Sequence, residues 1–232
     1  MANFRTHISV AAAGGALIAH AGWQAGLWDF MQSLPVLALT TFGGILPDID
    51  SDTSTSIRLI FNLLAIPAVV AAAVMLQDQL MAGVLVLVCG AIYLAVRYLA
   101  SAVFARFTVH RGVWHSLLAA LTCALVASAV SFRVFERPEA LAWAHGLALL
   151  AGFVIHLLLD ELYSVDLSGA RLKRSFGTAL KPVELDYPLA SLAMCGVALL
   201  MLPWLPEFDV LYRMAEGTAS ALFGLVPQSL PI

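Results

Sequence analysis

The sequence has little charge. Only 12% of its 232 residues are Asp, Glu, Lys or Arg, whereas a soluble domain has about 25%. Hydrophobic residues make up 61% of the chain, and the mean hydropathy is +0.91. So few ionisable groups cannot cover a surface that faces water, which excludes a disordered chain, a nucleic-acid-binding protein and an ordinary cytosolic enzyme. The composition is that of a protein whose solvent is the lipid bilayer.

Cysteine is also scarce. The three cysteines, Cys89, Cys123 and Cys195, are odd in number and have no CxxC spacing. This pattern excludes a disulfide framework and a thiolate metal site, so we expect each to pack as a small apolar side chain. A cleavable signal peptide pattern is missing too, because the apolar run 8–22 contains His20 and continues into further apolar segments. We therefore expect a retained first helix.

Long apolar stretches are what the chain has instead. A helix crosses a bilayer with about 20 mainly apolar residues, within a range of roughly 17–25. This measure predicts an all-α, polytopic helical membrane protein of one domain, residues 1–232, with about seven membrane segments. The segments are 7–25, 33–47, 58–76, 79–98, 113–132, 141–163 and 188–205.

Two stretches depart from the simple crossing pattern. The second segment is short and contains Gly43 and Gly44 before Pro47, so we expect it to be tilted, broken or re-entrant. An eighth stretch, 209–226, carries three charged residues. It is predicted to be a C-terminal interfacial helix rather than a span.

Lys and Arg are unevenly divided between the predicted loops. If the chain alternates sides, nine lie on the side where it begins and three, Arg133, Arg137 and Arg213, on the other. The positive-inside rule then places the N-terminus in the cytoplasm. The basic loop 164–187 is expected to anchor at anionic headgroups, and a flap over a phosphate-bearing substrate is the alternative.

Seven His and Asp residues fall at the same, cytoplasmic ends of the predicted helices. They are His7, Asp48, Asp50, His110, His115, His156 and Asp160. Charged groups inside a membrane segment cost about 2.5–3.5 kcal/mol and so tend to mark function. The predicted helices and their orientation depend on the apolar and basic residues and not on these His and Asp residues. Their shared level therefore predicts one common site. His20 and His145 lie roughly 20 Å and 16 Å from that level along their helices and are expected to be packed or interfacial.

Two motifs carry histidines of this set. His156 and Asp160 are four residues apart on one predicted helix, a spacing that suits two ligands of one metal or a ligand and its orienting group. A stabilising His–carboxylate pair is the alternative. In the run 110–116, Gly112 lets the chain turn, so that His110 and His115 can share a pocket with Arg111 available for an anionic group. The alternative there is a polar interfacial loop.

Three carboxylates stand on alternate residues where the second segment ends, at positions 48, 50 and 52. An EF-hand loop is rejected because its sixth and twelfth positions are Thr53 and Leu59 instead of Gly and Glu. A DxD cation site, or carboxylates that join a His-rich metal site, fits better. A solvated cluster at a helix end is the alternative, and Asp52 is expected to be part of one.

With these residues assembled, the chain resembles the LexA-regulated, inner-membrane-associated family of metal-dependent hydrolases. The resemblance rests on His7, Gly43-Gly44-Ile-Leu-Pro-Asp48-Ile-Asp50, His110-Arg111-Gly112-Val-Trp-His115-Ser116 and His156-Leu-Leu-Leu-Asp160. It implies a metal-dependent hydrolase embedded in the bacterial cytoplasmic (inner) membrane. A fainter similarity, in the order of the same His and Asp residues, is to zinc-dependent phospholipase C. The chain departs from that pattern in length, in being polytopic and in lacking a late His/Glu pair after Asp160.

The function predicted from these features is hydrolysis of an ester or phosphoester in a lipid or amphiphile at the cytoplasmic membrane face. Imidazole and carboxylate ligands suit one or two divalent ions, with zinc first and manganese or iron as alternatives. The predicted metal ligands are His7, Asp48, Asp50, His110, His115, His156 and Asp160. Asp50 is also the predicted bridging ligand or general base, and Arg111 would stabilise the developing negative charge.

The expected partners are the lipid bilayer and a lipid or amphiphilic small-molecule substrate, without nucleic acid. A divalent-metal transporter and a non-catalytic membrane protein are the alternatives. A transporter site is expected near the midplane on broken helices with inverted repeats, whereas this polar set lies at one face.

Overall fold

The computed structural model describes residues 3–50, 55–107, 112–166, 171–172 and 180–223. Its elements in chain order are α1 (Phe4–Gln24), α2 (Phe30–Gly43), the 3-10 turn η1 (Leu46–Asp50), α3 (Thr55–Leu76), α4 (Ala82–Leu94), the π-helical segment η2 (Ala95–Ala100), α5 (Ser101–Phe107), α6 (Leu117–Arg133), α7 (Glu139–Leu162), β1 (Val165–Asp166), β2 (Arg171–Leu172), α8 (Pro188–Met201), the 3-10 turn η3 (Leu202–Trp204) and α9 (Phe208–Phe223). Apart from the short antiparallel pair β1–β2, the described residues form helices, turns and loops, so the predicted all-α class is confirmed.

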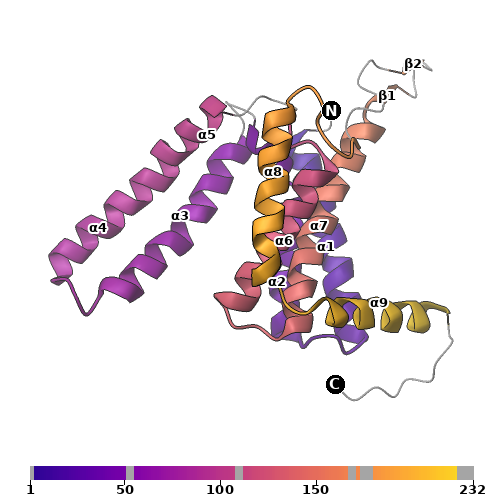
Figure 1. Cartoon of the computed structure of the whole chain (residues 1–232), viewed down its shortest axis with the longest axis horizontal. Coiled ribbons are helices and arrows are strands. Elements are labelled where there is room, and N and C mark those ends of the chain that lie inside the picture. The colour runs from indigo at the N-terminus through magenta and orange to yellow at the C-terminus, as the bar shows by residue number, and fades with distance from the viewer. Residues whose placement is uncertain (1–2, 51–54, 108–111, 167–170, 173–179, 224–232) are drawn as a thin grey trace.

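Helix α7 is the centre of a bundle formed with α1, α2, α6 and α8 (Figure 1). Its neighbours approach closely because glycines stand at the contacts. A Cβ atom on Gly152 of α7 would lie 1.9 Å from the carbonyl oxygen of Thr40, and one on Gly43 of α2 would lie 2.3 Å from that of Leu149. Small residues at such crossings let two backbones touch. The α2–α7 contact therefore has no room for a side chain at either glycine.

Helices α3 and α4 form a hairpin that stands away from this bundle (Figure 1). Only the first part of α3 joins the core, where Ile57, Ile60 and Phe61 are buried with residues of η1. Further along, α3 exposes Val70, Val74 and Met75, and α4 has no buried residue among those described. Exposed apolar helices of this kind are expected where the surrounding solvent is lipid.

The number of candidate membrane spans is smaller than the seven predicted. Among the described residues, three helices are long and apolar enough to cross: Ile57–Leu76, Ala82–Phe104 and Glu139–Leu162. A fourth span results if Pro188–Trp204 and Phe208–Glu216, bent by 91°, count together. With 14 and 17 residues, α2 and α6 are roughly 21 Å and 26 Å long, less than the ~30 Å hydrocarbon core. Polar residues such as His7 and His20 lower the hydropathy of α1, although it has 21 residues.

The second and the last predicted stretches have the expected irregularities. α2 ends at Gly43 and gives way to η1, which is the break anticipated from the glycine pair before Pro47. α9 turns sharply from α8 and crosses the end of the bundle opposite the N-terminus (Figure 1). An ion pair of 3.2 Å joins Arg213 and Asp209 on its exposed surface. Whether α9 lies in a membrane interface stays a prediction.

Candidate metal centre

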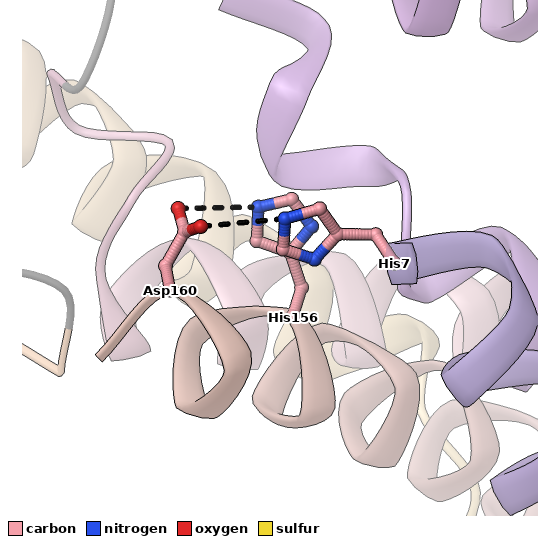
Figure 2. Close-up of side chains that lie close together, drawn as sticks. All are labelled: His7, His156 and Asp160. Carbon is pink, nitrogen blue, oxygen red and sulfur yellow. Dashed lines mark ion pairs between the residues drawn. The ribbon is translucent and has the colours of Figure 1, made fainter. Parts of the chain in front are cut away.

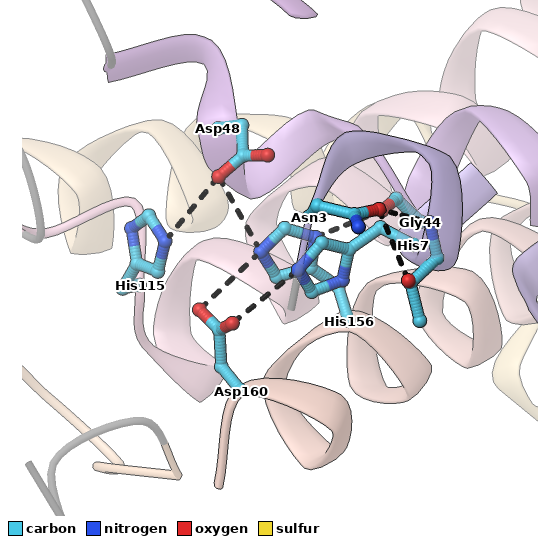
Figure 3. A network of polar contacts seen from close by, with 8 residues as sticks. Asn3, His7, Gly44, Asp48, His115, His156 and Asp160 are labelled. Carbon is cyan, nitrogen blue, oxygen red and sulfur yellow. Dashed lines mark hydrogen bonds and ion pairs between the residues drawn. The ribbon is translucent and has the colours of Figure 1, made fainter. Parts of the chain in front are cut away.

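Four segments that are far apart in the sequence meet at the end of the bundle where the chain begins (Figures 1 and 3). The first turn of α1 contributes His7, η1 contributes Asp48, the residue before the N-cap of α6 is His115, and the last turns of α7 contribute His156 and Asp160. Figure 3 shows these side chains converging. We refer to the five residues as the His/Asp cluster.

Local capping places two of the four segments. The side chain of Asn3 accepts a hydrogen bond of 2.9 Å from the N–H of Thr6 and so begins α1 just before His7. Ser116 caps α6 in the same way, through a 3.2 Å bond from the N–H of Ala119. Such caps satisfy N–H groups that a helix leaves unpaired at its start. Both histidines are thereby held at well-defined helix beginnings.

His156 occupies the middle of the cluster and is fully buried. Its Nδ1 lies 2.8 Å from the carbonyl oxygen of Gly44. A carbonyl can only accept, so Nδ1 carries the hydrogen and Nε2 of the neutral ring presents its lone pair to the cluster. Nε2 lies 3.6 Å from Oδ1 of Asp48 and 3.8 Å from Oδ2 of Asp160. Among the described residues it has no hydrogen-bond partner.

His7 stacks on His156, with ring centroids 3.8 Å apart and an angle of 15° between the planes (Figure 2). Nε2 of His7 lies 3.3 Å from Oδ1 of Asp160, so the two oxygens of this carboxylate face the two rings. Two stacked imidazolium rings would repel each other. The stacking therefore favours a neutral ring, which would offer a lone pair.

Asp48 links His156 to the third histidine. Its Oδ1 lies 3.9 Å from Nε2 of His115, whose ring centroid is 5.7 Å from that of His156 (Figure 3). The Asp48 side chain is 17% exposed, whereas the other side chains of the cluster are at most 3% exposed. Asp48 is thus the member of the cluster that a molecule from outside would meet first.

The cluster has the atoms and the spacing that a divalent ion needs. Two sets of three donors, His7–His156–Asp160 and Asp48–His115–His156, each lie within 4.8 Å of one another and share His156. Four donors at about 2.1 Å around a tetrahedral zinc ion lie roughly 3.4 Å apart, close to the 3.3–3.9 Å measured between the imidazole and carboxylate atoms. Burying the Nε2 lone pair of His156 without a partner would be costly, and an ion would satisfy it.

Five of the seven predicted metal ligands are therefore found together. The side chain of Asp50, and His110 and Arg111 entirely, lie outside the described residues. The roles assigned to these three stay predictions.

The two histidines predicted to lie elsewhere are far from the cluster along their helices. His20 is exposed near the end of α1, with its ring beside Trp23. His145 is buried in the first half of α7, where its Nδ1 lies 2.7 Å from Oγ of Ser131 on α6. The three cysteines are free and half-buried, as their surroundings in the sequence predicted.

The carbonyl group of Gly44 is a contributor that the sequence did not indicate. Its position depends on the close approach of α2 and α7 at Gly43 and Gly152. The glycine pair at 43–44 was noted only as a helix break. The remaining signal in the sequence was Gly152, which stands four residues before His156.

Comparison with known proteins places these residues in a family. Residues 1–180 match the YdjM inner membrane protein family. It is the LexA-regulated inner-membrane family that the motifs resemble, so this resemblance is confirmed. The match includes the whole His/Asp cluster, while α8 and α9 lie beyond it. No curated protein and no solved structure gave a significant match.

Proposed function

Since the chain belongs to the YdjM inner membrane protein family, we propose that it is a metal-dependent hydrolase of the inner membrane. It cleaves an ester or phosphoester bond of a lipid or amphiphile at the cytoplasmic face. The observation that carries this proposal is the convergence of three histidines and two aspartates from four segments into one buried cluster. Buried ionisable groups at the ends of apolar helices are costly and tend to mark function.

The ion that suits the cluster best is zinc, with manganese or iron as alternatives, because the donors are three imidazoles and two carboxylates. His7, Asp48, His115, His156 and Asp160 would hold it. The donor sets meet at Nε2 of His156, and Nδ1 of that ring is bonded to Gly44. A single nitrogen lone pair binds one ion, so we propose one ion for these five residues.

A bound ion of this kind supplies a water of lowered pKa and polarises the carbonyl or phosphoryl oxygen of the substrate. The residues of the chain prepare the site for that chemistry. Gly44 fixes the ring of His156, and one oxygen of Asp160 lies 3.3 Å from Nε2 of His7. Asp48 stands at the exposed side, where the substrate enters. Asp50, two residues further on, is the proposed general base, and Arg111 would stabilise negative charge that develops on the substrate.

The place of the cluster suits a substrate from the bilayer. Of the helices that carry it, α7 is long and apolar enough to cross a membrane, and the cluster lies at one end of it. A lipid can therefore present its headgroup to the cluster while its chains stay in the hydrocarbon region.

The experiment that tests the proposal measures release of lipid products. The purified full-length protein is assayed on vesicles of phosphatidylglycerol and phosphatidylcholine, with chelator and then with added zinc. We expect products that disappear with chelator and return with zinc. Asp160→Asn should abolish them, whereas Glu161→Gln, at the neighbouring carboxylate on α7, should not. Metal-dependent uptake into proteoliposomes without any product would contradict a hydrolase and indicate a transporter.

A further inference from the structure

An apolar groove lies next to the His/Asp cluster, on the side where α3 leaves the bundle. Its volume is about 330 Å³, and its lining includes Ile8 of α1, Leu37, Ala38 and Phe42 of α2, and Leu59 and Leu63 of α3. The hydroxyl of Thr41, which also lines it, donates a 2.8 Å hydrogen bond to the carbonyl of Leu37. The other side chains that line the groove are apolar.

The groove exists because α2 and α3 are held together at one end only. At η1 and the residue before it, Ile49 and Ile45 share a core with Ile57 and Ile60 of α3. Beyond that point α3 diverges from the bundle (Figure 1). Ala38, which is small and exposed, does not fill the space that opens between the helices.

Two residues of the groove lining are sequence neighbours of residues that build the cluster. Ile8 follows His7, and Ile45, which also lines the groove, follows Gly44, the residue whose carbonyl holds His156. From that end the lining runs along residues 34–45, a length of about 16 Å at ~1.5 Å per residue. This is roughly half of the ~30 Å hydrocarbon core, the depth of one leaflet.

We propose that the groove holds one aliphatic chain of the lipid whose headgroup reaches the His/Asp cluster. This inference rests on the proposed function. A groove lined almost entirely by apolar side chains that opens toward hydrocarbon is filled by lipid, because an empty space would lose the dispersion contacts of its lining. A helix of a partner protein, about 10–12 Å across, is a worse fit, since the volume is at the lower end of that of small-molecule sites. The groove thus selects substrates that carry a long apolar chain.

The test uses photolabelling, which needs no turnover. The full-length protein is placed in vesicles of phosphatidylcholine and phosphatidylglycerol that contain phosphatidylglycerol with a diazirine midway along one acyl chain. After illumination, labelled residues are mapped by mass spectrometry. We expect the groove residues of α2 and α3 to carry more label than the exposed residues of α8. Ala38→Trp should lower the groove label several-fold, and Ala193→Trp, the same change at an exposed position of α8, should leave it unchanged.

Equal labelling of α8 and the groove, or an unchanged groove label in Ala38→Trp, would overturn the inference. Zinc content is measured on every variant as a check of the fold. If Ala38→Trp loses zinc, the smaller change Ala38→Leu takes its place and is held to the same criterion. A wild-type protein that shows groove labelling but no hydrolysis would contradict the proposed function and leave lipid binding in the groove standing.

Discussion

Helix α7 carries two buried histidines with different surroundings. His145 lies toward its beginning and His156 toward its end, roughly 16 Å apart. In each ring Nδ1 lies within hydrogen-bonding distance of an oxygen on a neighbouring segment. For His145 it is Oγ of Ser131, and for His156 it is the carbonyl oxygen of Gly44. Nε2 of His156 faces two carboxylates, whereas no potential metal-binding group among the described residues includes His145. Burial alone therefore does not place a histidine in a candidate metal-binding group; what faces its second nitrogen decides.

The two ends of α7 also differ in how closely α7 meets its neighbour. Near His145, a Cβ on Gly146 would meet the side-chain oxygen of Ser128 at 2.0 Å and a backbone oxygen of Ala124 at 2.6 Å. Toward His156, a Cβ on Gly152 would meet the backbone oxygen of Thr40 at 1.9 Å. The first contact is partly with a side chain that can rotate. The second is with backbone alone, which makes the end with the cluster the less tolerant of change.

The largest effect that we expect on the fold comes from Gly152→Ala. The added methyl group would force α2 away from α7 and move Gly44 from His156, at a cost of about 3 kcal/mol. The unfolding temperature and the zinc content should both fall. Gly90→Ala on α4, where an added Cβ meets no atom within 4 Å, is the matched control and should change neither. A Gly152→Ala protein with normal zinc content would refute the link between helix packing and the cluster.

Ser131→Ala is expected to have a smaller effect, confined to the other end of α7. It removes the hydrogen bond to His145, and such bonds between membrane helices contribute about 0.6–1.7 kcal/mol. The unfolding temperature should fall slightly, while zinc content stays at the wild-type level. Loss of zinc in this variant would mean that the two ends of the helix are coupled.

The smallest effect concerns acid stability near the start of α6. The N–H groups of Leu117 and Leu118 donate to the carbonyls of Lys181 and Pro182, both at 3.0 Å. Burial tends to raise the pKa of Glu184, but hydrogen bonds from Lys181 and from the backbone of Asp186 hold it below its ordinary value. A lowered pKa in the folded state stabilises the protein above the unfolded pKa, and that contribution is lost as the pH falls through the folded value.

We expect this carboxylate to contribute under about 1 kcal/mol. Glu184→Gln should therefore flatten the loss of stability below about pH 4, the region in which Glu titrates. The measurement is the unfolding temperature as a function of pH in wild type and variant. Identical acid profiles would show that Glu184 does not stabilise the segment that caps α6.

The sequence predicted more of the His/Asp cluster than of the arrangement of the helices. The i,i+4 spacing of His156 and Asp160 places both on one face of any helix, and their common level with His7, Asp48 and His115 followed from counting residues along predicted helices. The carbonyl of Gly44 was beyond prediction, because its role depends on the distance between two helices. That distance is set by the glycines at 43 and 152 together.

The number of spans was overestimated for a related reason. Hydropathy counts apolar residues without showing where a helix ends, and α2 ends at Gly43 after 14 residues. The divergence of α3 from α2, and with it the groove, had no signal in the sequence either. Both depend on the tertiary core around η1, to which Ile45, Ile49 and Ile60 belong.

The most direct test of the central claim is the metal content of two matched variants of α7. Wild-type protein, His156→Ala and His145→Ala are purified in parallel and analysed for bound zinc, manganese and iron, with Asp160→Asn as a near-isosteric second variant of the cluster. We predict about one ion per chain in wild type and in His145→Ala, and none in His156→Ala or Asp160→Asn. An unchanged ion content in His156→Ala and Asp160→Asn would contradict a metal centre at this end of the helix.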